Sequence, residues 1–284
     1  MKVFSNPDEA DPDKATEHMR TQTQNILSDV DFSPKDIDEA IKELHPYSAT
    51  PDGDMPARVL LSCKDHLSYP LYLLWSKSLN SGEIPACLKH QYITPVFKKG
   101  DRTKAENYRP VSITSHLIKV FERVLRVRIV KFLEENNFLS KHQHGFRKMR
   151  SCLTQLLEHF DNVLKTLSSG DEVDVIYLDY AKAFDKVDHN ILLAKLEKCG
   201  VKGKVLSWIK KFLLEREQTV VVEGKKSKPR LVRSRVPQGT VLGPILFILY
   251  INDQLDILLY CLGKICRRHK TCWKDLRYYY YCDR

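Results

Sequence analysis

The sequence predicts an α+β fold, and three observations support this class. Apolar residues recur every three to four positions over several long stretches, which indicates amphipathic helices. Short β-branched runs at 173–178, 219–222 and 230–232 indicate strands. A composition with 43% hydrophobic and 10% aromatic residues is sufficient for a buried core. The chain as a whole is therefore not expected to be disordered.

The N-terminal part is expected to contain a flexible lead-in and then helices. Residues 1–31 are rich in polar side chains and lack apolar periodicity, so we expect them to be flexible. Residues 32–81 are expected to form a helical N-terminal extension. Its first helix begins with Ser33 as N-cap and Pro34 as first helical residue. A second helical stretch is expected from residue 57 to about residue 79.

The middle of the chain is expected to alternate between helices and strands. From residue 115 to 136, apolar residues such as Ile118 and Phe121 recur at helical spacing, while basic residues occupy the other faces. This stretch is expected to be a basic amphipathic helix. The other expected elements are a strand at 93–97, helices at 151–167, 190–199 and 204–216, and a hairpin between 219–222 and 230–232.

Charge is distributed unevenly along the chain. The formal net charge is +10, but residues 1–54 hold 5 Lys/Arg and 13 Asp/Glu, net −8, which leaves +18 for the remainder. A basic body suits a polyanionic partner, because neutralised phosphates release condensed counterions. A basic surface without such a partner is the alternative.

The cysteines and the hydropathy pattern indicate an intracellular protein. Eight cysteines without a secretory signal peptide fit a reducing compartment better than a disulfide framework. No apolar run reaches membrane-spanning length, since the stretch 244–259 is interrupted by Asn252, Asp253 and Asp256. We therefore expect no membrane partner.

The stretch from Tyr177 to Asp185 reads Tyr-Leu-Asp-Tyr-Ala-Lys-Ala-Phe-Asp. Its Asp179 follows a run that is expected to form a buried strand, so the carboxylate lies at the C-terminal end of that strand. Such a carboxylate is either a structural cap of the next turn, which is the commoner case, or a ligand of a hard metal ion. The aspartate alone does not decide between them.

Other stretches along the chain narrow the choice. They are Thr94–Asp101 with Asn107–Ser112, then His144–Arg147, and finally Val236–Pro244. Together with the aspartate motif, their order and spacing resemble the reverse transcriptases of LINE-type (non-LTR) retrotransposons. Each short motif would be weak alone, but the ordered set is specific.

The resemblance runs from about residue 32 to residue 253, and it implies a right-hand polymerase fold. A reverse transcriptase domain would cover 82–256, with fingers at 82–172 and an incomplete palm at 173–256. The activity implied is RNA-directed DNA polymerisation, with an RNA template, a DNA primer and deoxynucleoside triphosphates as partners. The nucleus as the place of action is implied by the family only.

The resemblance also implies roles for single residues. Asp179 would be the first carboxylate of a site for two Mg²⁺ ions, and the Tyr180 carbonyl could be a further ligand. Phe184 matches the bulky residue that selects deoxynucleotides, with an ordinary core aromatic as the alternative. Asp185 is expected to be a structural hydrogen-bonding carboxylate.

Further positions match residues that bind nucleotides or nucleic acid. Arg109 and Lys98 match fingers residues that grip the triphosphate, although a solvated turn is the alternative for Lys98. Gln238 and Gly239 match the motif that contacts the templating and incoming bases, where glycine allows close approach of the backbone. The template-primer path would be lined by basic residues, with solvated helix faces as the alternative for each: Lys119, Arg123, Arg126, Arg147 and Lys148.

The chain departs from the family pattern after Asp253. The family carries an adjacent Asp-Asp pair on a hairpin soon after this position, and this chain has no adjacent Asp-Asp pair. Back-translation of Lys264–Lys274 in a shifted frame is compatible with Lys-Phe-Ala-Asp-Asp-Thr-Lys-Leu-Val-Gly. We therefore expect a frameshift between about residues 253 and 263, with residues 257–284 out of frame.

A zinc site is the rival interpretation of this tail. It would use Cys261, Cys266, His269 and Cys272, but their spacings do not fit the usual paired ligands.

Because one carboxylate cannot hold two Mg²⁺ ions about 4 Å apart, the chain is expected to be inactive as a polymerase. The alternatives to a polymerase by descent are a non-catalytic RNA-binding remnant and a decayed gene product.

Overall fold

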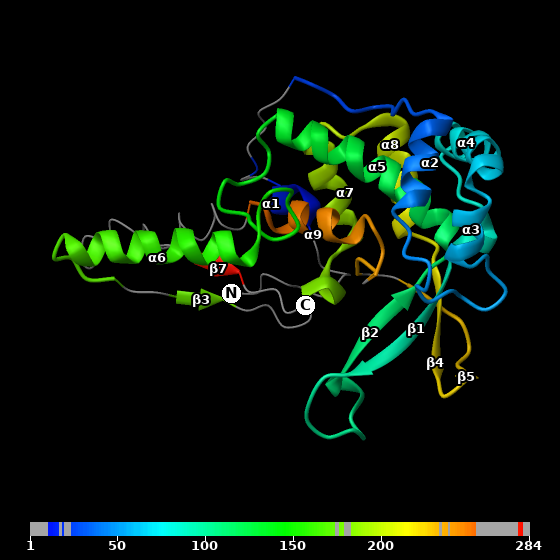
Figure 1. Cartoon of the computed structure of the whole chain (residues 1–284). Coiled ribbons are helices and arrows are strands. Elements are labelled where there is room, and N and C mark those ends of the chain that lie inside the picture. Colours follow the sequence, from blue (N-terminus) through cyan, green and yellow to red (C-terminus); the bar gives the residue numbers. More distant parts are fainter. Residues whose placement is uncertain are drawn as a thin grey trace.

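The computed structural model describes residues 11–16, 19, 24–173, 176–178, 183–232, 235–237, 239–253 and 278–280. A helical body carries a sheet that extends from one end, and one helix projects from its side (Figure 1). The α-helices of the described part are α1 (Pro12–Thr16), α2 (Pro34–Lys42), α3 (Ala57–Ser62), α4 (Lys64–Ser81), α5 (His116–Glu135), α6 (Cys152–Ser168), α7 (His189–Lys198), α8 (Gly203–Leu213) and α9 (Gly243–Ile251). Short 3-10 helices are η1 (Ala86–Leu88), η2 (Ala105–Asn107) and η3 (Ala183–Lys186).

The core of the helical body is organised around α5. The Phe121 ring of α5 stacks on Trp75 of α4, with ring centroids 5.0 Å apart, and meets Trp208 of α8 edge-on at 5.1 Å. All three rings are fully buried. Because aromatic side chains bury large apolar areas, these contacts bind together three helices that are distant in sequence.

Helix α2 begins at the predicted position. The Ser33 hydroxyl accepts a hydrogen bond from the Asp36 amide, and the Asp36 carboxylate accepts one from the Ser33 amide at 2.9 Å. This reciprocal arrangement satisfies two amide donors at the helix start. The apolar face of α2, with Ile37 and Ile41, is buried against α4 and α5.

The helical stretch expected from residue 57 to about residue 79 is present, but it is divided. The structure has two helices, α3 and α4, which meet at Cys63. The Cys63 amide donates to the Val59 carbonyl, while the Cys63 carbonyl accepts from the amides of His66 and Leu67. The chain therefore changes direction at Cys63 without leaving these backbone groups unpaired.

The strands of the main sheet lie in the order β2 (Tyr108–Ile113), β1 (His90–Phe97), β4 (Glu217–Val222) and β5 (Lys225–Lys226), and β6 (Arg230–Leu231) also pairs with β4. Strand β1 is antiparallel to β2 and parallel to β4. The parallel pairing ends at Ile93 and Val220, before Pro95 of β1, which has no amide to donate. The predicted strand at 93–97 is thus confirmed and extended.

The predicted hairpin is also present, although a break divides its second arm. Strand β4 turns at Glu223 and Gly224, both with positive φ, into β5 (Lys225–Lys226). After the break, β6 (Arg230–Leu231) pairs with the beginning of β4. Both hairpins of the sheet extend in the same direction from the helical body (Figure 1).

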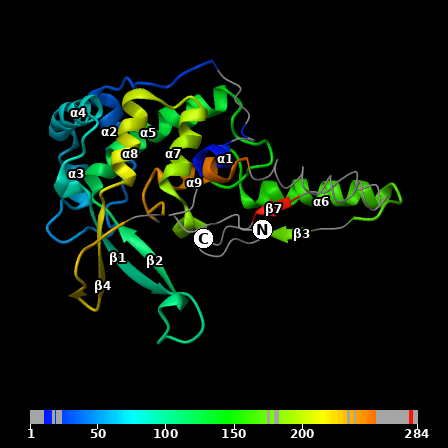
Figure 2. The same cartoon turned by 180° about the vertical axis from the view of Figure 1, so that it is seen from behind.

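Helix α6 projects away from the body, as seen from both sides in Figures 1 and 2. The helix itself was predicted, but its apolar residues are exposed rather than buried: Leu153, Leu156, Leu157, Phe160, Leu164 and Leu167. Strand β3 (Ile176–Leu178) follows α6 and pairs in parallel with β7 (Tyr278–Tyr280). β7 lies within the part of the chain that was expected to be out of frame.

Candidate functional site

Three predicted site residues, Asp179, Tyr180 and Gln238, lie outside the described residues. Strand β3 ends at Leu178, directly before Asp179, which agrees with the expected strand. The other predicted site residues are described.

Phe184 lies where three separate parts of the sequence meet. Its ring stacks on Phe247 of α9, with centroids 4.3 Å apart and an interplanar angle of 21°. Phe146, from the predicted His144–Arg147 motif, approaches the same ring edge-on at 6.5 Å. Phe184 is only half-buried, so this packing fits a core aromatic and also leaves part of the ring accessible.

The segment before Gln238 is held against the residues that follow Phe184. The amide of Val236 donates to the Phe184 carbonyl at 3.1 Å, and the amide of Arg235 donates to the Val187 carbonyl at 2.9 Å. His189 donates through Nε2 to the Arg235 carbonyl at 2.8 Å. Burial lowers the pKa of His189, so the neutral imidazole serves as this donor.

Asp185 is an ion-pair partner of Arg235. One of its carboxylate oxygens lies 3.6 Å from Arg235 Nη1, and the same guanidinium hydrogen-bonds Gln218 of β4. This ion pair is compatible with a structural role for Asp185, and that role stays a prediction.

Gly239 requires the freedom of glycine for two reasons. Its φ is +105°, and a Cβ at this position would lie 2.6 Å from the carbonyl oxygen of Ser112 in β2. Other L-residues are strained at such φ values, and a Cβ could not fit. The close approach that demands glycine here is thus to the protein's own strand. Contact of Gly239 with nucleic acid stays a prediction.

Arg109 and Lys98 lie on the hairpin formed by β1 and β2. Arg109 pairs with Val96 across the two strands and is half-buried, whereas Lys98 is exposed at the tip. The Lys98 amide donates to the Asn107 carbonyl at 2.9 Å, which closes the tip. Four basic side chains gather at this end of the hairpin: Lys98, Lys99, Arg102 and Lys104.

The basic residues of α5 are less available than their sequence suggested. Arg123 donates to the Glu43 carboxylate at 3.2 Å and to the Glu43 carbonyl at 3.1 Å. Lys119 is half-buried, and burial lowers its pKa. Arg126 is also half-buried. Among these predicted positions, Arg123 thus already serves to hold α5 to the segment after α2.

This pairing is part of a wider pattern, in which the acidic N-terminal region is bound to the basic body. Side-chain ion pairs join Asp29 to Lys204 at 2.5 Å, Asp36 to Arg128 at 2.9 Å and Asp52 to Lys226 at 2.7 Å. The charge asymmetry was visible in the sequence, but these partners were not predicted.

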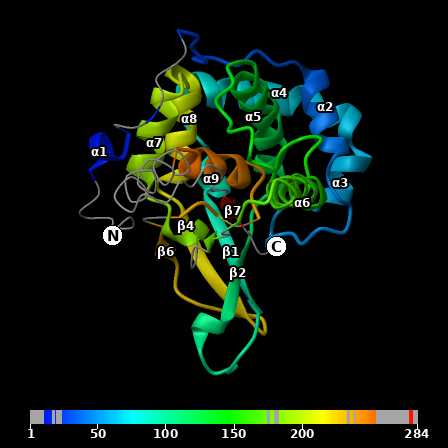
Figure 3. The same cartoon turned by 90° about the vertical axis from the view of Figure 1, so that its left-hand side faces the viewer.

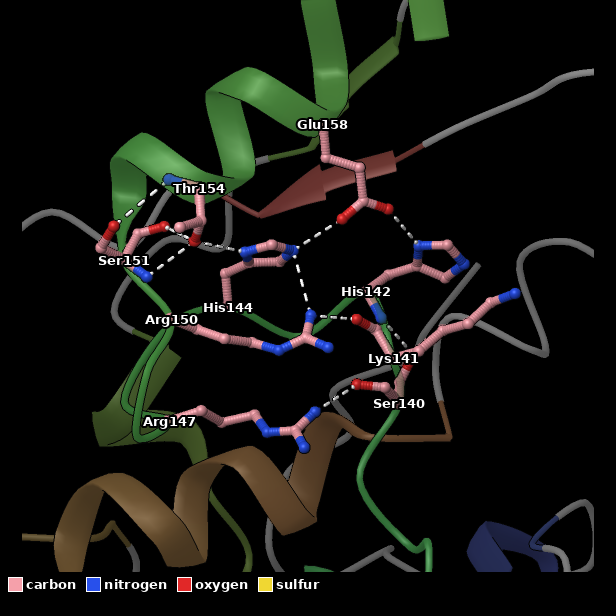
Figure 4. A network of polar contacts seen from close by, with 9 residues as sticks. All are labelled: Ser140, Lys141, His142, His144, Arg147, Arg150, Ser151, Thr154 and Glu158. Atoms are coloured by element: carbon pink, nitrogen blue, oxygen red, sulfur yellow. Dashed lines mark hydrogen bonds and ion pairs between the residues drawn. The ribbon is translucent and has the colours of Figure 1, made fainter. Parts of the chain in front are cut away.

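A polar network connects the His144–Arg147 motif to the base of α6 (Figure 4). Glu158 of α6 accepts from His144 Nε2 at 2.9 Å and lies 3.1 Å from His142 Nδ1. Arg147 donates to the Ser140 carbonyl at 2.9 Å, so one end of its guanidinium is used within the protein. Lys148 is exposed.

Two residues that sequence reasoning missed are Glu122 and Arg216, both fully buried. Glu122 accepts the amides of Val241 and Leu242, just before α9. A single acidic residue on the apolar face of the predicted helix was the available signal for Glu122.

Within the described residues, no group of three or more His, Cys, Asp and Glu side chains is arranged to hold a metal ion. Over the same residues, no helix is long and apolar enough to cross a membrane.

Comparison with known proteins gives a consistent result. A family model described as reverse transcriptase (RNA-dependent DNA polymerase) matches residues 96–283. That range includes most of the tail for which a changed frame was predicted, and the frameshift stays a prediction.

Several curated relatives are polymerases of mobile elements. The chain is 29% identical over 83% of its length to the probable RNA-directed DNA polymerase from transposon BS of Drosophila melanogaster, covering 26% of that protein. It is 28% identical over 84% of its length to the RNA-directed DNA polymerase from mobile element jockey of Drosophila funebris, again covering 26%. The chain therefore spans about a quarter of the length of these relatives.

A more local match and a structural match were also found. The probable RNA-directed DNA polymerase from transposon X-element of Drosophila melanogaster is 35% identical over 54% of this chain, covering 17% of that protein. A chain of a partial Cas6-RT-Cas1--Cas2 complex is similar with a TM-score of 0.42 and 15% identity, covering 81% of this chain and 34% of that chain.

Proposed function

Since the chain belongs to the reverse transcriptase (RNA-dependent DNA polymerase) family, we propose that it contains the template-primer and nucleotide-binding part of a mobile-element polymerase. The observation that carries this proposal is the convergence of three motifs. The Val236 amide bonds to Phe184, and Gly239 lies against Ser112 of β2. Stretches that are far apart in sequence thus meet at one place, beside a basic hairpin.

In this proposal, residues 82–172 form the fingers and residues 173–256 form a partial palm. Arg109 and Lys98 grip the triphosphate of an incoming nucleotide. Phe184 limits the space near its sugar, and Gln238 with Gly239 contacts the base pair. The template-primer duplex is bound by basic side chains, namely Lys119, Arg126, Arg147 and Lys148, and Arg123 would join them only by exchanging its bond to Glu43 for a phosphate.

The family chemistry uses divalent metal ions, and we propose that this chain cannot hold the pair. Asp179 and the Tyr180 carbonyl would bind one side of the site, but a second metal-binding carboxylate is required. Asp253 is engaged with buried Lys195 at 2.5 Å, and Asp185 faces Arg235. Neither is free to replace the missing Asp-Asp pair. We therefore propose binding of RNA and primer without catalysis.

The test is binding of a labelled RNA template annealed to a DNA primer, measured by fluorescence anisotropy at several salt concentrations. Affinity should fall as salt rises, because phosphate contacts release counterions. Lys148→Ala should reduce the slope of log affinity against log salt by about 1. Lys165→Ala on the projecting helix is the matched control, since Lys165 pairs with Asp161 within α6. Its slope should equal that of the unmodified chain.

Primer extension with deoxynucleotides and Mg²⁺ tests the second half of the proposal. No extension above background is expected. Extension would contradict the proposal that the metal site is incomplete. If the chain shows no salt-dependent duplex binding in the anisotropy assay, the result would favour a decayed gene product.

A further inference from the structure

Glu122 is an ionisable residue in the middle of the core. It lies on the buried face of α5, and its side chain has no exposed surface. One carboxylate oxygen, Oε2, accepts the backbone amide of Val241 at 2.7 Å and that of Leu242 at 2.9 Å. Both amides belong to the end of the loop 236–242, which carries Gln238 and Gly239.

The surroundings of Glu122 compensate part of the cost of burial. Burial raises the pKa of Glu122, while the two amide donors and the positive charge of Arg216 oppose this shift. Arg216 is itself fully buried, with its guanidinium over the Phe212 ring at 4.8 Å. Well-packed apolar residues often replace such buried charges without loss of stability. Stability alone therefore does not account for a carboxylate at this position.

The bonds of Glu122 act on the loop from the side of α5. Within the loop, the Thr240 hydroxyl donates to the Pro237 carbonyl at 2.9 Å and accepts from the Gly243 amide at 3.2 Å. On the opposite side, Gly239 touches the Ser112 carbonyl of β2. Figure 3 shows α9, which begins at the end of this loop, lying below α5. The described residues at 239–242 are thus held between α5 and β2.

We propose that Glu122 is a positioning residue: its carboxylate holds the backbone at Val241 and Leu242 so that Gly239 stays pressed against β2. This inference rests on the proposed function, which gives Gln238 and Gly239 their contact with the base pair. Glu122 itself touches no nucleic acid. It acts through the loop.

The variants distinguish three properties of the Glu122 side chain: its hydrogen-bond acceptor, its charge and its volume. Glu122→Gln, always combined with Arg216→Met so that no buried charge is left without its partner, keeps an acceptor oxygen without the charge. The double variant Glu122→Met/Arg216→Met removes both buried charges, keeps apolar volume, and leaves the two loop amides without an acceptor. Because no unpaired charge remains buried, the double variant is designed to stay folded. Glu135→Gln, at the exposed C-terminal end of the same helix, is the matched control.

The first measurement is amide hydrogen exchange of Val241 and Leu242 in the whole chain. In the double variant these amides should exchange at least about tenfold faster, while amides in the middle of α5 keep their protection. Glu122→Gln should stay within about threefold of the unmodified chain, because its oxygen still accepts. Unchanged protection in the double variant would overturn the proposal. So would equal acceleration in both variants.

The second measurement is duplex affinity by the anisotropy assay. The double variant should bind about tenfold more weakly at fixed salt, with an unchanged salt slope, because no phosphate contact is lost. Glu122→Gln should bind the duplex with most of the affinity of the unmodified chain. If Glu122 only filled space, the Gln and Met variants would bind equally. If the unmodified chain binds no duplex, the proposed function fails, whereas exchange at Val241 and Leu242 still decides whether Glu122 holds the loop.

Discussion

Helices α5 and α6 share the regular spacing of their apolar residues, but these residues are buried in α5 and exposed in α6. Both are amphipathic, and both have apolar residues at intervals of three to four positions. Ile129 of α5 has no exposed surface, whereas Leu157 of α6 is 61% exposed. Among the residues of α6 whose burial is described, only His159 is buried.

The difference teaches that periodicity predicts a helix and its apolar face, but not the partner of that face. α5 is covered by α2 and by aromatic residues of α4 and α8. α6 extends past the helical body, and its base is held through Glu158 and Thr154 (Figure 4). Local sequence determines the first property, and tertiary contacts determine the second.

The largest expected effect comes from removing an aromatic ring at the centre of α5. Phe121→Ala should lower the free energy of unfolding by about 3–5 kcal/mol, since it leaves a cavity between two tryptophans. Urea denaturation followed by tryptophan fluorescence measures this change. Phe160→Ala on α6 is the matched control, and it should change stability by no more than about 0.5 kcal/mol. Equal losses would show that the apolar face of α6 is covered in solution.

The second effect compares two lysine–aspartate pairs with almost equal distances. Lys195 and Asp253 are buried and 2.5 Å apart, while Lys165 and Asp161 on α6 are exposed and 2.6 Å apart. Lys195→Met should cost about 3 kcal/mol, because Asp253 is left as an unpaired buried charge. Lys165→Met should cost less than about 0.5 kcal/mol. Urea denaturation measures both changes. Equal losses of stability from the two substitutions would contradict this prediction.

The third effect is the dependence of stability on pH, which is expected to occur in different pH ranges for the core and for the base of α6. Burial lowers the pKa of His116 and His189, so the unfolded chain binds protons at higher pH than the folded chain. Stability from these residues is present above about pH 6.5 and is lost as pH falls below it. Burial raises the pKa of Glu158, but hydrogen bonds from His144 and His142 outweigh this and lower it. The contribution of Glu158 is therefore lost only as pH falls below about 4.5.

Urea denaturation at several pH values tests this order. Between about pH 7 and pH 5 the free energy of unfolding should decrease, because His116 and His189 take up protons on unfolding. His189→Gln, which keeps a donor for the Arg235 carbonyl, should make this loss smaller. Glu158→Gln should leave the loss in this interval as it is. If Glu158→Gln removes the loss of stability between pH 7 and pH 5 and His189→Gln does not, the loss comes from the base of α6 and not from the core.

The smallest effect is expected on the apolar face of α6. Leu157→Lys should change the free energy of unfolding by less than about 0.5 kcal/mol, since the side chain is already in water. It should also reduce self-association, measured by sedimentation, because it interrupts an exposed apolar surface. The same substitution at fully buried Leu125 of α5 should prevent folding. A large loss of stability from Leu157→Lys would mean that α6 has a partner within the chain.

The sequence was sufficient to predict elements whose signals are local. The cap at Ser33 and the apolar spacing in α5 and α6 each predicted a helix within about two residues. The pairing of β1 with β4 was not predicted, because nothing near either strand specifies a partner so distant in sequence.

The candidate site was predictable to the extent that its motifs are linear. Gly239 was selected for its glycine, but its contact with Ser112 depends on the fold. The basic side chain of Arg123 suggested a nucleic-acid contact, whereas its bond to Glu43 depends on how α5 packs. The sequence shows the charge of a side chain, but it does not show which residue that side chain contacts in the folded chain.

The parallel pairing of β1 with β4 has a consequence for synthesis of the chain. Because His90 pairs with Glu217, one edge of β1 has no partner until most of the described chain has left the ribosome. The hairpin of β1 and β2 can form early, but its open edge is then a template for pairing with other nascent chains. Slow translation between α5 and β4 is therefore expected to lower the yield of folded protein, even though every contact in the finished structure is unchanged.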